Sequence, residues 1–286
     1  MKSIIHPLNQ ITIKHFIEFN ILSYYKNNFK MKQIKYNSTD VLGYNIFSAS
    51  LENIKSTKKV VINTINQYSY CLAEKDKSFK KALMDSDILL PDGIGIVAAS
   101  RFITKKKINR ITGADLHKYL LEKANKNNWR CFYLGSTNQT LEKIRKRCNE
   151  EYPNIIINTF SPPFKPDFAE EDNQKMIERI NEFSPDVLFI GMTAPKQEKW
   201  AISYKDFVEA KAICSIGAVF DFYAGTVERP RKLWRDLGLE WFGRLLKEPR
   251  RMWKRYLYYG PLFIYHIIMK ITIIDRYIFR SRSTFT

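Results

Sequence analysis

Cysteine and histidine are scarce in this chain. Of its 286 residues, only four are cysteines and four are histidines. No two cysteines have the spacing of metal ligands, so we expect reduced, buried thiols rather than disulfides; they are Cys71, Cys131, Cys148 and Cys214. No histidine has a serine or cysteine partner at the end of a predicted strand, which gives a hydrolase triad little support. The sequence therefore predicts no bound metal and no cofactor.

Long apolar runs are also missing. The best candidate for a membrane span, residues 256–279, is rich in aromatic and aliphatic side chains but contains Lys270, Asp275 and Arg276. A span needs about 20 mostly apolar residues, and a charge near its centre costs about 2.5–3.5 kcal/mol. The short apolar run at residues 11–22 is interrupted by charges and lacks the form of a signal peptide. We therefore expect no convincing transmembrane helix.

Acidic residues are few compared with basic ones. There are 29 Asp and Glu against 47 Lys and Arg, which gives a net charge of +18. Residues 1–36 hold six basic and one acidic residue, residues 37–228 hold 27 and 24, and residues 229–286 hold 14 and 4. This distribution predicts an N-terminal extension (1–36), a nearly neutral body (37–228) and a basic C-terminal segment (229–286). Such a segment should bind anions, such as nucleic acid, an acidic membrane surface or a phosphorylated substrate.

Short apolar runs alternate with helical patterns through the body. The predicted strands are residues 60–66, 87–91, 130–134, 154–159, 186–191 and 212–216. The predicted helices are residues 67–84, 112–127, 138–151, 170–183 and 195–207. Several strands are apolar on both faces, as parallel strands covered on both sides are. We expect an α/β fold with a Rossmann-like, mostly parallel sheet, helices on both faces and a basic helical C-terminal appendage.

Small and polar residues follow every predicted strand. They lie at residues 64–66, 91–93, 134–137, 161–163, 191–198 and 217–221. The opposite strand ends are ordinary charged turns. Because ligands of open α/β sheets bind at the carboxyl ends of the strands, this edge should carry the site.

Two further motifs match known ligand-binding patterns, but their surroundings in the sequence do not fit those patterns. The run from Gly93 to Ala98 matches the dinucleotide fingerprint, but a Pro-Asp pair precedes it and no acidic residue ends a second strand about 20 residues later. Asp85 and Asp87 form a D-x-D pair, which in some sugar transferases holds a divalent cation, but they precede their strand and so lie at the wrong edge. Residues 196–198 (KQE) are open to interpretation as a solvated helix start.

Asp92 lies between a proline and a glycine at a strand end. Its spacing fits two roles equally well. One is a turn residue that caps the following helix. The other is a general base, for which partial burial would have to raise the pKa from about 3.9.

The C-terminal segment mixes arginines with tryptophans and leucines. Trp234, Leu237, Trp241 and Leu245 fall near one helical face, and Pro249 should end that helix. Three interpretations remain open, namely a helix packed on the body, a helix on an anionic membrane surface, and a nucleic-acid contact. No nucleic-acid-binding motif is present, so the composition favours the membrane surface.

Taken together in their order, the motifs resemble the WecG/TagA/CpsF glycosyltransferases from about residue 40 to residue 260. The motifs are T-x-N (Thr64, Asn66), P-D-G (91–93), R-x-T-G-x-D (110–115), L-G-S (134–136), P-D-x-L-x-x-G-x-x-x-P-K-Q-E (185–198), G-A-x-x-D-x-x-A-G (217–225) and a C-terminal motif containing G-L-E-W and E-P-R-R (229–251). Residues 1–36 and those after Gly260 carry no such resemblance.

The resemblance implies a bacterial, inverting, metal-independent sugar transferase. The donor would be a UDP-sugar carrying N-acetylmannosamine, its uronic acid or glucose. The acceptor would be a polyprenyl-diphosphate-linked saccharide, and the product a precursor of teichoic acid, common antigen, capsule or exopolysaccharide. The enzyme would be cytoplasmic and peripherally attached to the anionic inner face of the cell membrane, with no nucleic-acid partner and with homo-oligomerisation left open.

The resemblance also implies roles for individual residues. Asp92 would be the general base, and Thr64 and Asn66 would place the donor or acceptor beside it. The other residues expected to bind substrate are Gly93, Arg110, Gly135, Gln197, Asp221 and Arg229. Those expected at the membrane and acceptor are Arg244, Arg250, Arg251 and Arg255. Two alternatives stay open, a nicotinamide-dependent Rossmann oxidoreductase and a non-enzymatic basic protein that binds membranes or nucleic acid.

Overall fold

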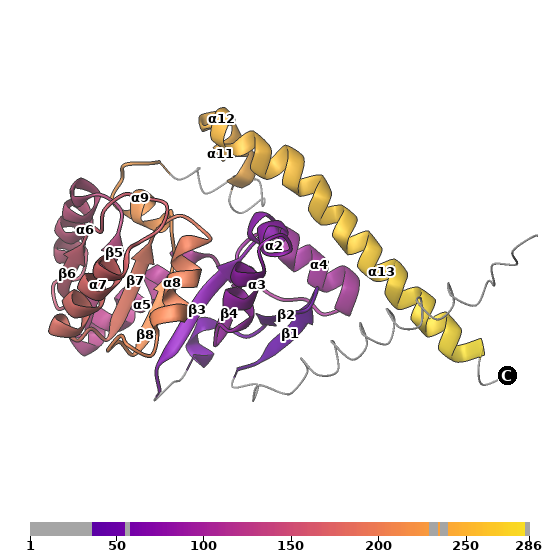
Figure 1. The fold of residues 1–286 in the computed structure, drawn as a ribbon, viewed down its shortest axis with the longest axis horizontal. Coiled ribbons are helices and arrows are strands. Elements are labelled where there is room, and N and C mark those ends of the chain that lie inside the picture. Colours follow the sequence, from indigo (N-terminus) through magenta and orange to yellow (C-terminus); the bar gives the residue numbers. More distant parts are fainter. Residues whose placement is uncertain (1–35, 55–57, 229–233, 235–239, 284–286) are drawn as a thin grey trace, which may run out of the picture. The chain divides into compact units, whose positions relative to one another are not determined.

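The computed structural model describes residues 36–54, 58–228, 234 and 240–283 (Figure 1). Within these ranges, the side chains of Glu240, Arg244, Arg251 and residues 273–283 are outside the description. Contacts divide the chain into the units Met1–Lys35 and Tyr36–Thr286, and all described residues belong to the second. The predicted boundary between body and C-terminal segment at residue 228 stays a prediction.

A six-stranded parallel sheet forms the centre of the body, as predicted. Its strands lie in the order β4-β3-β8-β7-β5-β6, and every neighbouring pair is parallel. The strands are β3 (Val60–Ile65), β4 (Ile88–Pro91), β5 (Arg130–Gly135), β6 (Ile156–Phe160), β7 (Val187–Gly191) and β8 (Ala212–Ser215). From β3 the chain passes outward to β4 at one edge of the sheet, whereas β7 and β8 approach β3 from the other side. Open α/β sheets commonly bind ligands where such connections diverge.

Both faces of the sheet are covered by helices because its strands are apolar on both sides. In β5, Tyr133 faces one layer and Phe132 the other, and both are almost completely buried. The first layer contains α5 (Gly113–Asn127), α6 (Asn138–Glu151) and α9 (Val219–Tyr223). The second contains α7 (Glu170–Phe183) and α8 (Lys196–Tyr204). The fold class is therefore confirmed, and all four cysteines are buried and unpaired, as expected.

The predicted helix at residues 67–84 is two helices. The segment forms α2 (Gln67–Ala73) and α3 (Lys77–Met84). Asp76 separates them because its carboxylate accepts hydrogen bonds from the backbone N–H groups of Ser78 and Phe79, both at 3.0 Å. An aspartate in this position satisfies the free N–H groups at a helix start and so begins a new helix.

Several elements were not predicted from the sequence. They are the antiparallel hairpin β1 (Ser38–Val41) and β2 (Tyr44–Phe47), the single turn η1 (Leu51–Asn53) and α9. The helix expected after Asp92, for which no bounds were predicted, is α4 (Ile94–Thr104). The hairpin packs with α2, α3 and α4 in a third apolar cluster beside the sheet. The same cluster includes Tyr259 and Phe263 from the C-terminal helix, so part of that helix belongs to the core of the body.

The described parts of the C-terminal segment are helical. It contains α11 (Glu240–Lys247), α12 (Pro249–Trp253), a π-helical turn η2 (Lys254–Tyr258) and α13 (Tyr259–Ser283). Tyr259 and Phe263 make edge-to-face contacts with Tyr68 and Tyr70 of α2, with ring centroids 5.0 and 5.3 Å apart. Across the described parts of the chain, no helix combines the length and apolar character needed to cross a membrane.

Candidate functional site

The carboxyl ends of β3 and β4 bring three of the predicted site residues together. Thr64 is in register with Leu90. Asp92 follows β4 directly, and its backbone N–H donates a hydrogen bond of 2.9 Å to the carbonyl oxygen of Ile65 at the end of β3. Asn66 is the next residue of that strand end. Thr64, Asn66 and Asp92 are all half-buried, so the edge remains accessible to a ligand.

Asn66 has a clear structural role. It is the N-cap of α2, and its Oδ1 accepts hydrogen bonds from the backbone N–H groups of Tyr68 and Ser69, both at 3.0 Å. The hydroxyl of Ser69 accepts in return from the Asn66 N–H, at 2.8 Å. The amide nitrogen Nδ2 is the part of the side chain that this cap does not use.

Gly93 must be a glycine at this turn. Its φ of +132° is strained for any residue with a Cβ. A Cβ added there would also lie 3.0 Å from Oε1 of Gln67 and 3.2 Å from Cβ of Asn66. Gly93 occupies the N-cap position of α4, so that position does not fall to Asp92. Gly93 thus packs against the start of α2, directly after Asp92.

Gly135 is explained by close strand packing. Its φ is +117°, and a Cβ there would lie 2.5 Å from the carbonyl oxygen of Gly191. Gly191 in turn lies against the ring of Phe220, which an added Cβ would approach to 2.4 Å. The end of β5 can approach β7 this closely only because Gly135 lacks a side chain, and Phe220 can pack on β7 only because Gly191 lacks one.

Gln197 and Glu198 lie at the other part of the edge, where β7 and β8 end. Gln197 is 5% exposed and Glu198 is 2% exposed, so the interpretation of this segment as a solvated helix start is wrong for both. Oε1 of Gln197 accepts from the backbone N–H of Met192 at 3.2 Å, and its Nε2 donates to Oε1 of Glu198 at 2.9 Å. Burial raises the pKa of Glu198 to about 7, although the hydrogen bond from Gln197 acts in the opposite direction.

Arg110 and Asp221 flank these two strand ends. Arg110 is half-buried, and the next residue, Ile111, donates its N–H to the carbonyl oxygen of Pro91 at 3.1 Å. Arg110 therefore lies beside the end of β4, in the segment between α4 and α5. Asp221 is half-buried in the first turn of α9, just after β8.

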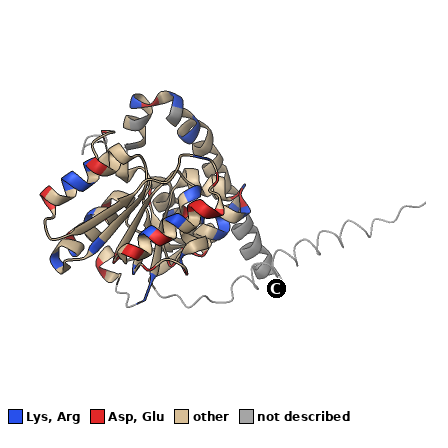
Figure 2. Ribbon diagram, turned by 60° about the vertical axis from the view of Figure 1, so that its left-hand side comes forward, with Lys and Arg blue, Asp and Glu red and all other residues tan. Residues whose placement is uncertain are grey.

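The structure describes only some of the C-terminal arginines predicted to bind the substrate or the membrane. Arg255 lies with its guanidinium carbon 4.3 Å from the ring centroid of Tyr68, two residues after Asn66. Arg250 is exposed in α12. Arg229 is outside the described residues, as are the side chains of Arg244 and Arg251. Figure 2 shows the charges of both signs along the helices of the body and the Lys and Arg positions in the C-terminal helices.

Comparison with known proteins identifies the family of this chain. A model of the Glycosyl transferase WecG/TagA/CpsF family matches residues 34–276. The chain belongs to this family. A Bacillus subtilis (strain 168) protein is 34% identical over 197 residues, which are 69% of this chain and 75% of that protein. A Staphylococcus aureus (strain MW2) protein is 29% identical over 238 residues, which are 80% of this chain and 91% of that protein. Both are named N-acetylglucosaminyldiphosphoundecaprenol N-acetyl-beta-D-mannosaminyltransferase.

Membership of the WecG/TagA/CpsF glycosyltransferase family confirms the resemblance. It favours a transferase over the two alternatives, a nicotinamide-dependent oxidoreductase and a non-enzymatic basic protein. The structure also argues against a dinucleotide at Gly93–Ala98. A Cβ on Gly95 would lie 3.3 Å from Oε1 of Gln67 and 3.3 Å from Cε1 of Phe263. Side chains thus cover the first turn of α4, where a pyrophosphate would have to bind.

The D-x-D pair of this glycosyltransferase has structural roles at the amino edge of the sheet. Oδ2 of Asp87 accepts a 2.9 Å hydrogen bond from the backbone N–H of Val61, and Asp85 pairs with Lys81 one turn earlier in α3. Among the described residues there is no group of three or more His, Cys, Asp or Glu side chains arranged to hold a metal ion.

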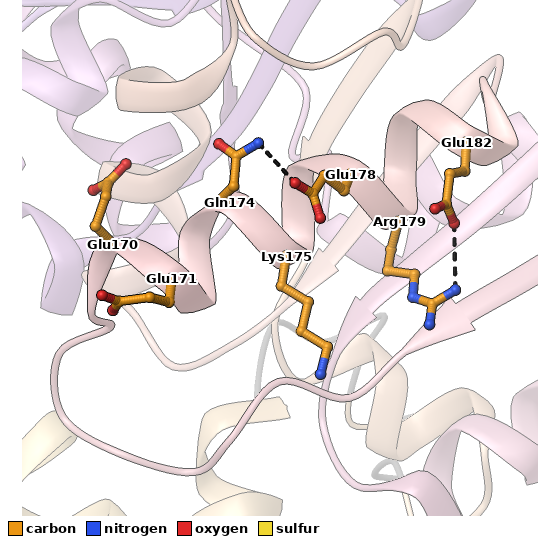
Figure 3. Close-up of a pocket in the computed structure, with 7 residues that line it drawn as sticks. All are labelled: Glu170, Glu171, Gln174, Lys175, Glu178, Arg179 and Glu182. Carbon is orange, nitrogen blue, oxygen red and sulfur yellow. Dashed lines mark hydrogen bonds and ion pairs between the residues drawn. The ribbon is translucent and has the colours of Figure 1, made fainter.

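A hollow on the transferase surface lies away from these residues. Figure 3 shows it along one side of α7, where its lining residues are Glu170, Glu171, Gln174, Lys175, Glu178, Arg179 and Glu182. The side chains pair within the helix, Gln174 with Glu178 at 3.0 Å and Arg179 with Glu182 at 3.3 Å. None of the predicted site residues lines it, so it does not form part of the candidate site.

Sequence reasoning missed Glu198 as a site residue. The available signal was the P-K-Q-E run directly after a buried strand, in which two polar residues follow the turn where ligands bind. Charge favoured a solvated helix start, but the packing of α8 on the sheet turned Gln197 and Glu198 inward.

Proposed function

We propose that this chain transfers N-acetylmannosamine from a UDP-sugar to an N-acetylglucosaminyl-diphosphoryl polyprenol. The acceptor and the transferred sugar follow from the names of the relatives, and the UDP carrier follows from the resemblance. The observation that carries the proposal is the position of Asp92, half-buried at the joined ends of β3 and β4 in a chain of this family.

Asp92 acts as the general base in a single displacement. Its carboxylate takes the proton from the acceptor hydroxyl as that oxygen attacks C1 of the donor sugar. The bond from C1 to the UDP oxygen breaks on the opposite side, so the configuration at C1 is inverted. One base is sufficient for this chemistry, and no covalent intermediate is needed.

Positive groups stabilise the leaving diphosphate. Arg110 lies beside the end of β4, and the guanidinium of Arg255 lies over the ring of Tyr68 in α2. Backbone N–H groups at helix starts add further donors along the same edge. We propose that these groups, with Arg229, Arg244, Arg250 and Arg251, take the role that a divalent cation has in other sugar transferases.

The C-terminal helices attach the enzyme to the membrane that contains its acceptor. Large apolar side chains remain exposed along these helices, at Trp253, Leu257, Ile264 and Ile268. Their spacing places them near one side of the helical segment, and Arg250 and Lys254 are exposed beside them. An apolar side flanked by basic residues is typical of helices that lie on an anionic leaflet, here the cytoplasmic face.

A donor panel tests the proposed function. We expect UDP release with UDP-N-acetylmannosamine and an N-acetylglucosaminyl-diphosphoryl lipid, at rates that EDTA changes by less than about twofold. UDP-glucose and the uronic acid donor should be slower by at least about tenfold, because a site that binds donor polar groups rejects a sugar that leaves them unpaired. Release that stops with EDTA and returns with Mg²⁺ or Mn²⁺ would disprove the metal-independent mechanism.

A further inference from the structure

A buried carboxyl group lies directly behind the predicted substrate-binding side chain Gln197. Glu198 is 2% exposed, and only one of its oxygens has a partner. Oε1 accepts from Gln197, while Oε2 is buried without a hydrogen bond to any described residue. None of the described ion pairs involves Glu198. Burying a carboxyl group without a cation destabilises the folded state, so its presence suggests a functional role in the site.

The hydrogen bonds of Gln197 define the direction of its amide. The Met192 N–H is a donor and therefore requires the amide oxygen on its side. The Glu198 oxygen is an acceptor and therefore requires the amide nitrogen on its side. Because the two ends of a glutamine amide have nearly the same shape, only such partners decide which end faces a ligand.

The amide is also held in place by packing. Gly217, the second residue after β8, has a φ of +51°, and a Cβ on it would lie 3.3 Å from both Nε2 and Oε1 of Gln197. Met192 directly follows β7. The Gln197 amide is thus fixed between the two strand ends, and Nε2 keeps a second N–H that the bond to Glu198 does not use.

We propose that Glu198 is a positioning residue of the transfer site, which orients the Gln197 amide so that its second N–H donates to an oxygen of the donor substrate. This inference rests on the proposed transferase function. Without Glu198, Nε2 loses its acceptor, and only the Met192 N–H still favours the correct orientation of the amide over the flipped one. A misdirected amide would present its oxygen to a negatively charged diphosphate, which is repulsive.

A double-mutant cycle separates positioning from a merely structural effect. We expect E198A and Q197A each to lower kcat/KM for the donor by about 10–100-fold, in the range of losing one oriented donor. The double variant should be no worse than Q197A within about threefold, because both changes remove the same contact. E198Q should stay within about threefold of the wild type, since its amide oxygen can accept the same hydrogen bond.

The outcomes are distinguishable. Equal loss from E198A in the wild-type and Q197A backgrounds would overturn the proposal, and so would E198Q as inactive as E198A. If E198A does not fold, E198M replaces it, because methionine fills the space without providing an acceptor. A folded E198M with wild-type activity would likewise overturn it. A wild-type protein inactive with every donor would instead contradict the transferase function itself.

Discussion

Asp92→Asn should lower the rate of sugar transfer by about 10²–10⁴-fold, the contribution expected of a positioned general base. Asparagine has the same shape but cannot take the proton of the acceptor hydroxyl. The fold should tolerate the change, because the hydrogen bond from residue 92 to Ile65 uses the backbone N–H. UDP binding should stay within about threefold of the wild type, since the base faces the acceptor side of the reaction.

Asp85→Asn is the matched control for this variant. Asp85 belongs to the D-x-D pair at the opposite edge of the sheet, where it pairs with Lys81. The measurement is single-turnover transfer to the lipid acceptor, with UDP affinity determined on the same preparations. A D92N protein that transfers at the wild-type rate would remove Asp92 from the mechanism. A large loss of transfer activity in D85N would indicate that the D-x-D pair takes part in the reaction.

Glu198→Gln should stabilise the protein more at pH 8 than at pH 5. Burial raises the pKa of Glu198 to about 7, compared with 4.5 for the group in its ordinary state. The folded state therefore binds more protons than the unfolded state between these values, and wild-type stability falls as pH rises through that interval. The shift corresponds to at most about 3 kcal/mol, and glutamine has no proton to lose.

The measurement is the free energy of unfolding in denaturant at pH 5, 6, 7 and 8. The gain of E198Q over the wild type should be below about 1 kcal/mol at pH 5 and reach its maximum above about pH 7. Glu178→Gln, at an exposed position on α7, is the control and should differ from the wild type by less than about 0.5 kcal/mol at both ends of the range. A gain for E198Q that is the same at every pH would contradict a buried carboxyl that titrates near neutrality.

The sheet could be predicted because its strands are marked by composition. Runs such as VLFIG in β7 are almost completely buried, as expected of a strand that is covered on both faces. The hairpin β1–β2 was missed because its strands have four residues each and contain polar side chains. The extent of helix α4 was not predicted because glycine and β-branched residues begin it, a pattern that helix propensity disfavours but burial against Phe263 and α2 allows.

The site could be predicted in part for a similar reason. Parallel strands place all their carboxyl ends at one edge, so Thr64, Asn66 and Asp92 could be grouped from order alone. Sequence could not show that Asn66 caps α2, that Gly135 is required by the approach of Gly191, or that Gln197 is held by Glu198. Each of these depends on contacts between residues from different elements, which spacing along one chain does not encode.

The linkage in the product tests the central claim most directly. The lipid acceptor is incubated with the full chain and α-linked UDP-N-acetylmannosamine, and the product is examined by mass spectrometry and by the one-bond C–H coupling of the new anomeric carbon. A single displacement with Asp92 as base predicts one added N-acetylhexosamine in β linkage. An α-linked product, or UDP release with an unmodified lipid, would contradict the account.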